Sequence, residues 1–224
     1  MGDQNLGAAK EATSAHRARL QANLYDPEHA AAGVPDEVDA ARAQEYALLS
    51  ALLARAPDAA LLARLSQLRA DPSPLGLAHG ALAEAAGRAT VEGIAREYFN
   101  LFIGIGRGEL LPYGSYYLSG FLHERPLARL RADLQRLGIE RAAGQAEPED
   151  HAAILCEIMA GIASGRFPVP AGADRELFER HLAAWIVRFF TDLERAEAAD
   201  FYRRVGTLGR VFTDIETQAF ALPA

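Results

Sequence analysis

The chain is organised around residues 97–120, which read EYFNLFIGIGRGELLPYGSYYLSG. A helix is expected to lead into this stretch, because apolar side chains recur at helical spacing and share one face. Those side chains are Val91, Ile94, Tyr98, Leu101 and Phe102. The pattern then stops at Gly104, Gly106 and Gly108, which a helix disfavours. A segment interrupted by glycine and rich in tyrosine is costly to order, so we interpret it as the leading candidate for a binding surface.

The rest of the chain predicts an all-α fold. Alanine and leucine dominate, β-branched residues are few, and prolines and glycines fall between apolar stretches of helical period. Ser73 and Thr90 are typical N-caps, Pro74 suits a first helical position, and Gly87 and Gly138 suit helix ends. The expected helices cover residues 36–56, 58–69, 75–86, 91–102, 115–122, 126–137, 148–164, 175–190 and 196–220.

We therefore expect one helical domain of about nine or ten helices over residues 35–222. Residues 1–34 are polar, rich in alanine and weakly periodic, which predicts a mostly disordered tail. No apolar run approaches the ~20 residues of a membrane span. Arg17 and Arg19 are not adjacent and no signal-peptide pattern is present, so we expect a cytoplasmic protein without a twin-arginine signal of its own.

Composition narrows the possible partners. The net charge of -7 argues against a nucleic-acid partner, which favours a basic face, and suits either a basic partner or simple solubility. The single cysteine, Cys156, excludes an internal disulfide and fits a reducing compartment. It lies among Ile154, Leu155 and Ile158, so we interpret it as a small core residue.

The glycines at 104, 106 and 108 also invite a nucleotide-loop interpretation. A phosphate loop follows a strand and continues into Gly-Lys-Ser/Thr, whereas this segment follows a helix and lacks that continuation. The structural alternative is that the glycines let the chain turn sharply and approach another helix closely.

A second candidate site is residues 147–151, which read EPEDH. If they start a helix, Glu147 and His151 share one face, which suits metal binding or acid–base chemistry. The alternative is a capped helix start, with Pro148 at the first helical position and Glu149 and Asp150 against the positive end of the helix dipole. No second cluster supplies further metal ligands.

The aromatic side chains have two interpretations. Tyr98, Leu101 and Phe102 fit a core stripe, and the helical spacing of His181, Trp185 and Phe189 places them in the core as well. Four aromatics follow Pro112 within nine residues, and we expect the three tyrosines among them, which lie among glycine and serine, to be partly exposed. Tyrosine combines an apolar face with a polar tip, which suits contact with a peptide. These four are Tyr113, Tyr116, Tyr117 and Phe121.

These motifs resemble those of the TorD/DmsD/NarJ family of cytoplasmic chaperones that mature molybdenum-containing redox enzymes. The first matching element is an aromatic residue, two residues, Leu-Phe, one residue and Gly, and it is followed by Pro-Tyr with a serine and a tyrosine; the last is Glu-Pro-x-Asp-His. The resemblance covers roughly residues 43–220. In this sequence the matching residues are Tyr98, Leu101, Phe102, Gly104, Pro112, Tyr113, Ser115, Tyr117, Glu147, Pro148, Asp150 and His151.

The resemblance implies a TorD-like helical fold and a chaperone rather than an enzyme. The implied partner is the catalytic subunit of a molybdenum-cofactor-dependent oxidoreductase, bound through its twin-arginine signal peptide or as a folding intermediate until cofactor is loaded. The matching residues become peptide contacts, with no metal or cofactor of the chain's own, and the chain is a monomer or an element-swapped dimer. Two alternatives stay open at this point. One is a nucleotide- or metal-dependent hydrolase using the glycine loop with Glu147 and His151, and the other is a structural subunit of a redox complex.

Overall fold

A computed structural model describes residues 36–141 and 146–222. Within these residues the chain forms ten α-helices and one π-helical turn, and it has no strand, which confirms the all-α class. The expected tail, residues 1–34, lies outside the described residues. The helices are α2 (Glu37–Ala54), α3 (Ala59–Leu65), α4 (Pro74–Arg88), α5 (Val91–Tyr98), α6 (Gly114–Ser119), α7 (Arg125–Arg136), α8 (Ala152–Ala163), α9 (Ala173–His181), α10 (Ile186–Arg195) and α11 (Phe201–Ala221), and the π-helical turn is Phe99–Ile103.

Local sequence sets the starts of the first four helices. Asp36, Asp58, Ser73 and Thr90 each accept a hydrogen bond from the backbone amide three residues on, at 2.8–3.1 Å. Each bond satisfies one of the amides that a helix start leaves without a partner. The two caps expected from the sequence, Ser73 and Thr90, are therefore confirmed. The expected end of α4 was wrong, because Gly87 lies inside that helix.

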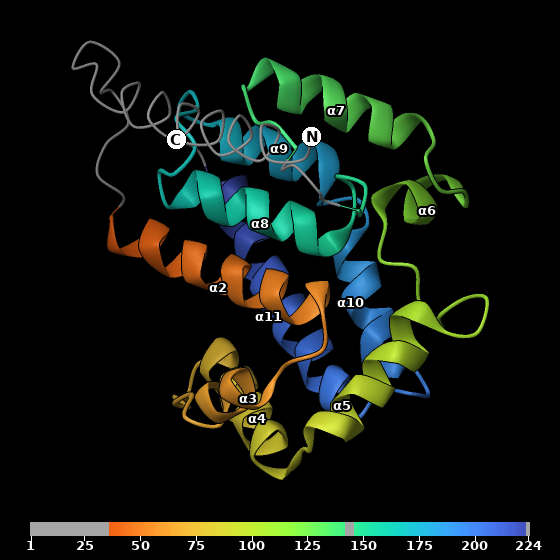
Figure 1. Cartoon of the computed structure of the whole chain (residues 1–224). Helices are drawn as coiled ribbons and strands as arrows, with labels where there is room; N and C mark the ends of the chain where they lie inside the picture. The colour runs from red at the N-terminus through yellow and green to blue at the C-terminus, as the bar shows by residue number, and fades with distance from the viewer. Residues whose placement is uncertain (1–35, 142–145, 223–224) are drawn as a thin grey trace, which may run out of the picture. The chain divides into compact units, whose positions relative to one another are not determined.

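The core forms where α2, α8, α10 and α11 meet. Helix α2 packs along α8, and α11 packs against α10 and α4 (Figure 1). Helix α8 is apolar on nearly all sides and most of its residues are buried, as expected for a helix enclosed by others. Cys156 lies within it, and burial raises the pKa of its thiol to about 12. The core assignment of Cys156 is confirmed.

The carboxyl-terminal helices differ from the expectation. Three helices replace the two long ones, because the chain turns between His181 and Ile186. The indole Nε1 of Trp185 donates to the carbonyl of His181 at 2.6 Å, which satisfies an acceptor at the end of α9. Trp185 and Phe189 are nevertheless buried, and the His181 side chain is 7% exposed, as expected for core residues.

Helix α11 begins at Phe201 rather than near residue 196. The carboxylate of Glu97, at the end of α5, accepts hydrogen bonds from the backbone amides of Asp200, Phe201 and Tyr202 at 2.7–3.2 Å. A side chain distant in sequence therefore caps this helix, which no local pattern could indicate. Within residues 36–141 and 146–222, no helix combines the length and apolar character needed to cross a membrane.

Candidate peptide-binding site

The tyrosine–glycine segment, residues 97–120, begins in the core. Leu101 is fully buried in the π-helical turn, and the ring of Phe102 packs 5.4 Å from that of Tyr202. The Tyr98 hydroxyl donates to the carbonyl of Leu53 at 3.2 Å, and burial followed by the charge of Glu147 raises the pKa of Tyr98 to about 12. Leu101 is therefore enclosed in the core, whereas Tyr98 and Phe102 pack against the core and are half-buried.

A tight loop follows the π-helical turn. Gly104 has a φ of 62°, and a Cβ atom there would lie 2.0 Å from the carbonyl oxygen of Arg107. Only glycine fits such a turn without strain. The loop follows a helix and not a strand, which agrees with the structural interpretation of its glycines. At the end of the loop, the backbone amides of Glu109 and Leu110 donate hydrogen bonds to the carbonyls of Asn100 and Leu101, at 3.1 and 2.8 Å.

Residues 112–114 and 150–152 lie side by side, so the structure brings the two motifs together. Tyr113 and His151 form an isolated antiparallel bridge. On either side of it, the Gly114 amide donates to the carbonyl of Asp150 at 2.9 Å, and the Ala152 amide donates to the carbonyl of Pro112 at 2.8 Å. Pro112 is buried and acts here through its carbonyl. The Pro112–Tyr113 element and the Glu-Pro-x-Asp-His element are therefore neighbours in the fold.

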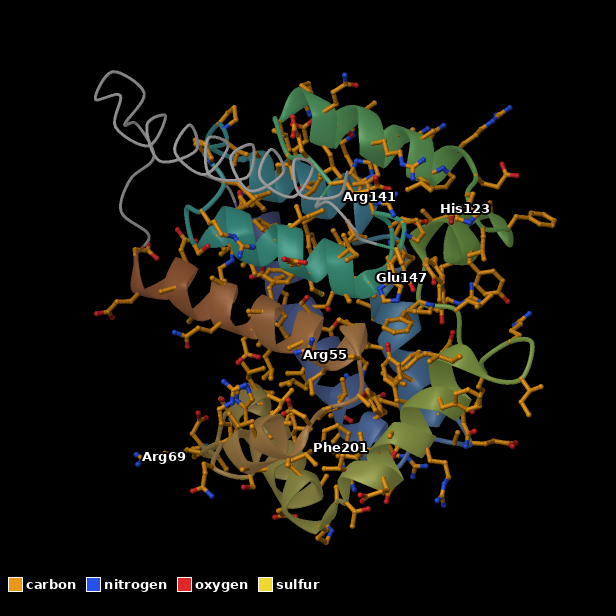
Figure 2. All side chains as sticks on the ribbon, viewed as in Figure 1. Arg55, Arg69, His123, Arg141, Glu147 and Phe201 are labelled. Carbon is orange, nitrogen blue, oxygen red and sulfur yellow. The ribbon has the colours of Figure 1, made fainter. Side chains whose placement is uncertain are left out.

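Tyr113 and Glu147 meet beside this bridge. The Tyr113 hydroxyl donates to Glu147 Oε2 at 2.6 Å, and the Tyr113 ring lies edge-on to the His151 ring with centroids 5.0 Å apart. Burial, together with the hydrogen bond to Glu147, raises the pKa of the Tyr113 phenol above its ordinary value. Glu147 itself is exposed, and Figure 2 shows it before α8 on the same side of the view as α6.

Asp150 and Ser115 have an internal role. Asp150 Oδ2 accepts a hydrogen bond from the Ser115 amide at 2.7 Å, next to the start of α6. Asp150 is 3% exposed and Ser115 is fully buried. Asp150 Oδ1 and Ser115 Oγ are buried without a hydrogen-bond partner among the described residues. In this conformation Asp150 joins the two motifs and is not open to a ligand from solvent.

His151 is the N-cap of α8. Its Nδ1 accepts a hydrogen bond from the Ala153 amide at 3.1 Å, so the ring is held in place. Burial lowers the pKa of His151, while the charges of Glu147 and Asp150 oppose that shift. The expected helix start at Pro148 was wrong: α8 begins at Ala152, because residues 150–152 are paired with residues 112–114 and residues 148–151 form a turn. Glu147 and His151 consequently do not share a helix face.

The metal-site alternative has no support from the geometry. Across residues 36–141 and 146–222, no group of three or more His, Cys, Asp or Glu side chains is arranged to hold a metal ion. The third carboxylate of the acidic motif is also engaged, because Glu149 accepts from Arg131 at 2.8–2.9 Å. Glu149 and Asp150 are buried, whereas Glu147, which accepts from the Tyr113 hydroxyl, is exposed.

Tyr117 forms the far end of the site. Its ring stacks 5.6 Å from that of Trp185, and its hydroxyl donates to Asp192 Oδ2 at 3.1 Å. Tyr113, Tyr116 and Tyr117 are all half-buried, as expected from their place among glycine and serine. Sequence reasoning missed Arg107 and Arg188, whose guanidinium groups lie over the rings of Tyr116 and Tyr117 at 5.5 and 5.6 Å. No spacing rule links those pairs, although Arg107 lies inside the segment that was singled out.

A family model described as the nitrate reductase delta subunit matches residues 68–191, more than half of the 224 residues. The chain belongs to this family, the TorD/NarJ family. The match includes both motifs of the site. Chaperone protein TorD from Vibrio cholerae is 28% identical over 128 residues, which covers 53% of this chain and 58% of that protein.

Two further similarities agree with this TorD/NarJ family membership. Probable Tat proofreading chaperone DmsD from Haemophilus influenzae is 31% identical over 119 residues, 52% of this chain and 57% of the relative. The chain thus spans little more than half the length of these two relatives, both of which are named as chaperones. A crystal structure from Archaeoglobus fulgidus, described as a candidate redox enzyme maturation protein, matches with a TM-score of 0.52 at 20% identity, over 79% of this chain and 93% of that one. This likeness supports the TorD-like helical fold.

Proposed function

We propose that this protein is a chaperone for a molybdenum-cofactor-dependent oxidoreductase. It would bind the twin-arginine signal peptide or the folding intermediate of the catalytic subunit and assist cofactor loading before export. Membership of the TorD/NarJ family and relatives named as a TorD chaperone and a Tat proofreading chaperone support this proposal. The protein would act in the cytoplasm, as a monomer or an element-swapped dimer, without nucleic acid or a cofactor of its own.

The observation that carries the proposal at residue level is the different exposure of the three carboxylates in the acidic motif. Asp150 and Glu149 are buried, at 3% and 9% exposure. Glu147 lies at the surface, where a carboxylate can accept two parallel N–H bonds from an arginine. We therefore propose Glu147 as the arginine contact, with Tyr113 beside it, and Asp150 and His151 as residues that hold the site in shape.

Calorimetry with synthetic peptides tests this function. The first peptide carries two adjacent arginines followed by about a dozen alternating leucine and alanine residues, the length of a signal apolar region. We expect a micromolar dissociation constant, about −8 kcal/mol, with a negative heat-capacity change from apolar burial. A Lys-Lys peptide should bind more weakly, because lysine lacks the planar fork that matches a carboxylate.

A matched pair of variants locates the contact. Glu147→Gln should weaken binding of the Arg-Arg peptide about tenfold and reduce its salt dependence, because exposed charges are screened over about 8–10 Å at physiological ionic strength. Glu140→Gln removes another exposed carboxylate from the loop after α7 and should leave the affinity unchanged. If the Arg-Arg peptide does not bind to folded wild-type protein, the proposal that this protein recognises a signal peptide is wrong. If the two substitutions change the affinity for the peptide equally, Glu147 is not the arginine contact.

A further inference from the structure

Exposed apolar side chains gather in one part of the chain. Of the eleven large apolar side chains that are exposed within residues 36–141 and 146–222, six lie between residues 99 and 122. Ile105 is 99% exposed and Phe121 is 69% exposed. We call these six residues the apolar rim. They are Phe99, Ile103, Ile105, Leu118, Phe121 and Leu122.

A pocket is lined by residues from both segments that carry the rim. Arg107 Nη2, in the glycine loop, donates to the hydroxyl of Tyr116 in α6 at 3.2 Å. An open pocket of about 420 Å³ lies between these segments, and its lining includes Leu110 from the loop and Gly120 at the end of α6. Figure 1 shows the glycine loop and α6 on the same side of the molecule's helical domain.

The glycine loop is held in place although Ile105 projects from it. The Glu109 carboxylate accepts hydrogen bonds from the amides of Glu197 and Ala198 at 2.7 and 3.0 Å, and the Leu110 amide donates to Leu101. Exposed apolar area is unfavourable by roughly 25 cal/mol per Å² relative to burial. A fixed loop that exposes isoleucine, next to a helix end that exposes phenylalanine, is therefore suited to burial against a partner.

The charged residues near the rim favour one orientation of a bound peptide. Glu147 contacts Tyr113 just before α6, whereas Arg107 and Arg188 line the pocket beside Tyr116 and Tyr117 of α6. The acids at the pocket are engaged: Glu109 by backbone amides, and Asp192 by the Tyr117 hydroxyl, with Arg188 at 4.0 Å. A cationic peptide end is thus favoured beside Glu147 and disfavoured beside the two arginines.

We infer that the apolar stretch of the signal-type peptide packs on the apolar rim, with its arginine pair at Glu147. This inference rests on the proposed function and assigns the apolar contacts to residues other than the motif positions that match the family. Leu101 is fully buried and Phe102 is half-buried, so the rim offers a peptide more apolar surface than these two residues do. Apolar burial on the rim and the charge contact at Glu147 together set the orientation of the peptide.

Substitution of exposed residues tests the inference without disturbing the core. Ile105→Ser and Phe121→Ser should each weaken binding of the Arg-Arg peptide about five- to tenfold, as expected for side chains buried at an interface, and should leave its salt dependence unchanged. Val38→Ser in α2 and Leu77→Ser in α4 are matched controls, because these side chains are 66% and 62% exposed. Both controls should bind as the wild type does. A peptide with the arginine pair moved behind the apolar stretch should bind more weakly.

The outcomes separate the two claims. If wild-type protein binds the peptide and the rim variants bind as tightly as the controls, the rim assignment is wrong while the proposed function stands. If wild-type protein does not bind, both fall. Photocrosslinking with a photoreactive leucine analogue in the apolar stretch should label residues 99–122, and labelling confined to other helices would overturn the assignment. Sedimentation that shows a wild-type dimer abolished by Ile105→Ser would identify the rim as a contact between copies of this chain instead.

Discussion

The hydroxyl of Tyr113 donates a hydrogen bond to Glu147 Oε2 at 2.6 Å, across 34 residues of sequence. The bond places a phenol with an apolar ring beside a surface carboxylate. It depends on the bridge between Tyr113 and His151, which sets the two segments side by side. The polar contact proposed for a peptide therefore rests on one backbone pairing.

Removal of the phenol should have a modest effect on stability. Tyr113→Phe removes the donor to Glu147, and we expect the free energy of unfolding to fall by about 0.5–1.5 kcal/mol. Tyr116→Phe is the matched control, because it removes the acceptor of an exposed bond from Arg107 and should cost less than about 0.5 kcal/mol. Urea denaturation measures both. Equal losses would show that the Tyr113 hydrogen bond stabilises the folded protein no more than a surface contact does.

Removal of the internal carboxylate should have a larger effect. Asp150→Ala leaves the buried Ser115 amide without its acceptor, and we expect a loss of about 1–3 kcal/mol in the free energy of unfolding. Glu147→Ala should lose less, because water can replace an exposed acceptor. Denaturant unfolding of both variants gives the comparison. A variant at Asp150 as stable as the wild type would contradict the joining role assigned to this residue.

The pH dependence of stability should reflect His151. Burial lowers its pKa below the ordinary 6.5, so the unfolded chain binds a proton more readily than the folded protein does. The contribution of neutral His151 is complete above about pH 6.5 and is lost as the pH falls toward the lowered folded value. His151→Asn keeps an N-cap acceptor, and its unfolding free energy should fall less steeply between about pH 6.5 and 5. A parallel slope in wild type and variant would exclude this role.

His79 provides a test of opposite sign. Glu45, whose Oε1 lies 2.6 Å from His79 Nε2, raises the pKa of His79, with burial opposing. The folded protein therefore holds this proton more tightly, and the stability so gained is complete below about pH 6.5. It is lost as the pH rises through the raised folded value. His79→Gln should be less stable than wild type at acidic pH, with the difference shrinking at alkaline pH. Thermal unfolding across the pH range would show a constant difference if the pair had no such effect.

Two glycines of the loop, Gly104 and Gly106, should tolerate substitution by alanine to different extents. Gly104→Ala places a Cβ atom 2.0 Å from the Arg107 carbonyl oxygen at a φ of 62°, so both the backbone conformation and a clash oppose it. Gly106 also has a positive φ, 85°, but a Cβ atom there meets nothing within 4 Å. We expect Gly106→Ala to cost about 1–2 kcal/mol from the conformation alone and Gly104→Ala to cost more. Equal losses on thermal unfolding would show that the loop relaxes around the clash.

Much of the fold was predictable because its determinants are local. The capping side chains of Asp36, Ser73 and Thr90 contact backbone amides only three residues on. Apolar spacing within a helix is equally local, which explains why the all-α class could be predicted from the sequence. Composition singled out two stretches as candidates, and the structure brings those stretches together at Tyr113 and His151. The contact role of the individual residues stays a prediction.

The sequence by itself determined the helical class, most helix starts and the two stretches of unusual composition, because each depends on neighbours within about one or two helical turns. Only the tertiary structure decided that α8 starts at Ala152 and that the chain turns before Trp185. It also decided that Asp150 faces inward to Ser115 while Glu147 stays at the surface. Two carboxylates three residues apart are chemically alike in the chain. Partners more than thirty residues away, Ser115 and Tyr113, give them different surroundings.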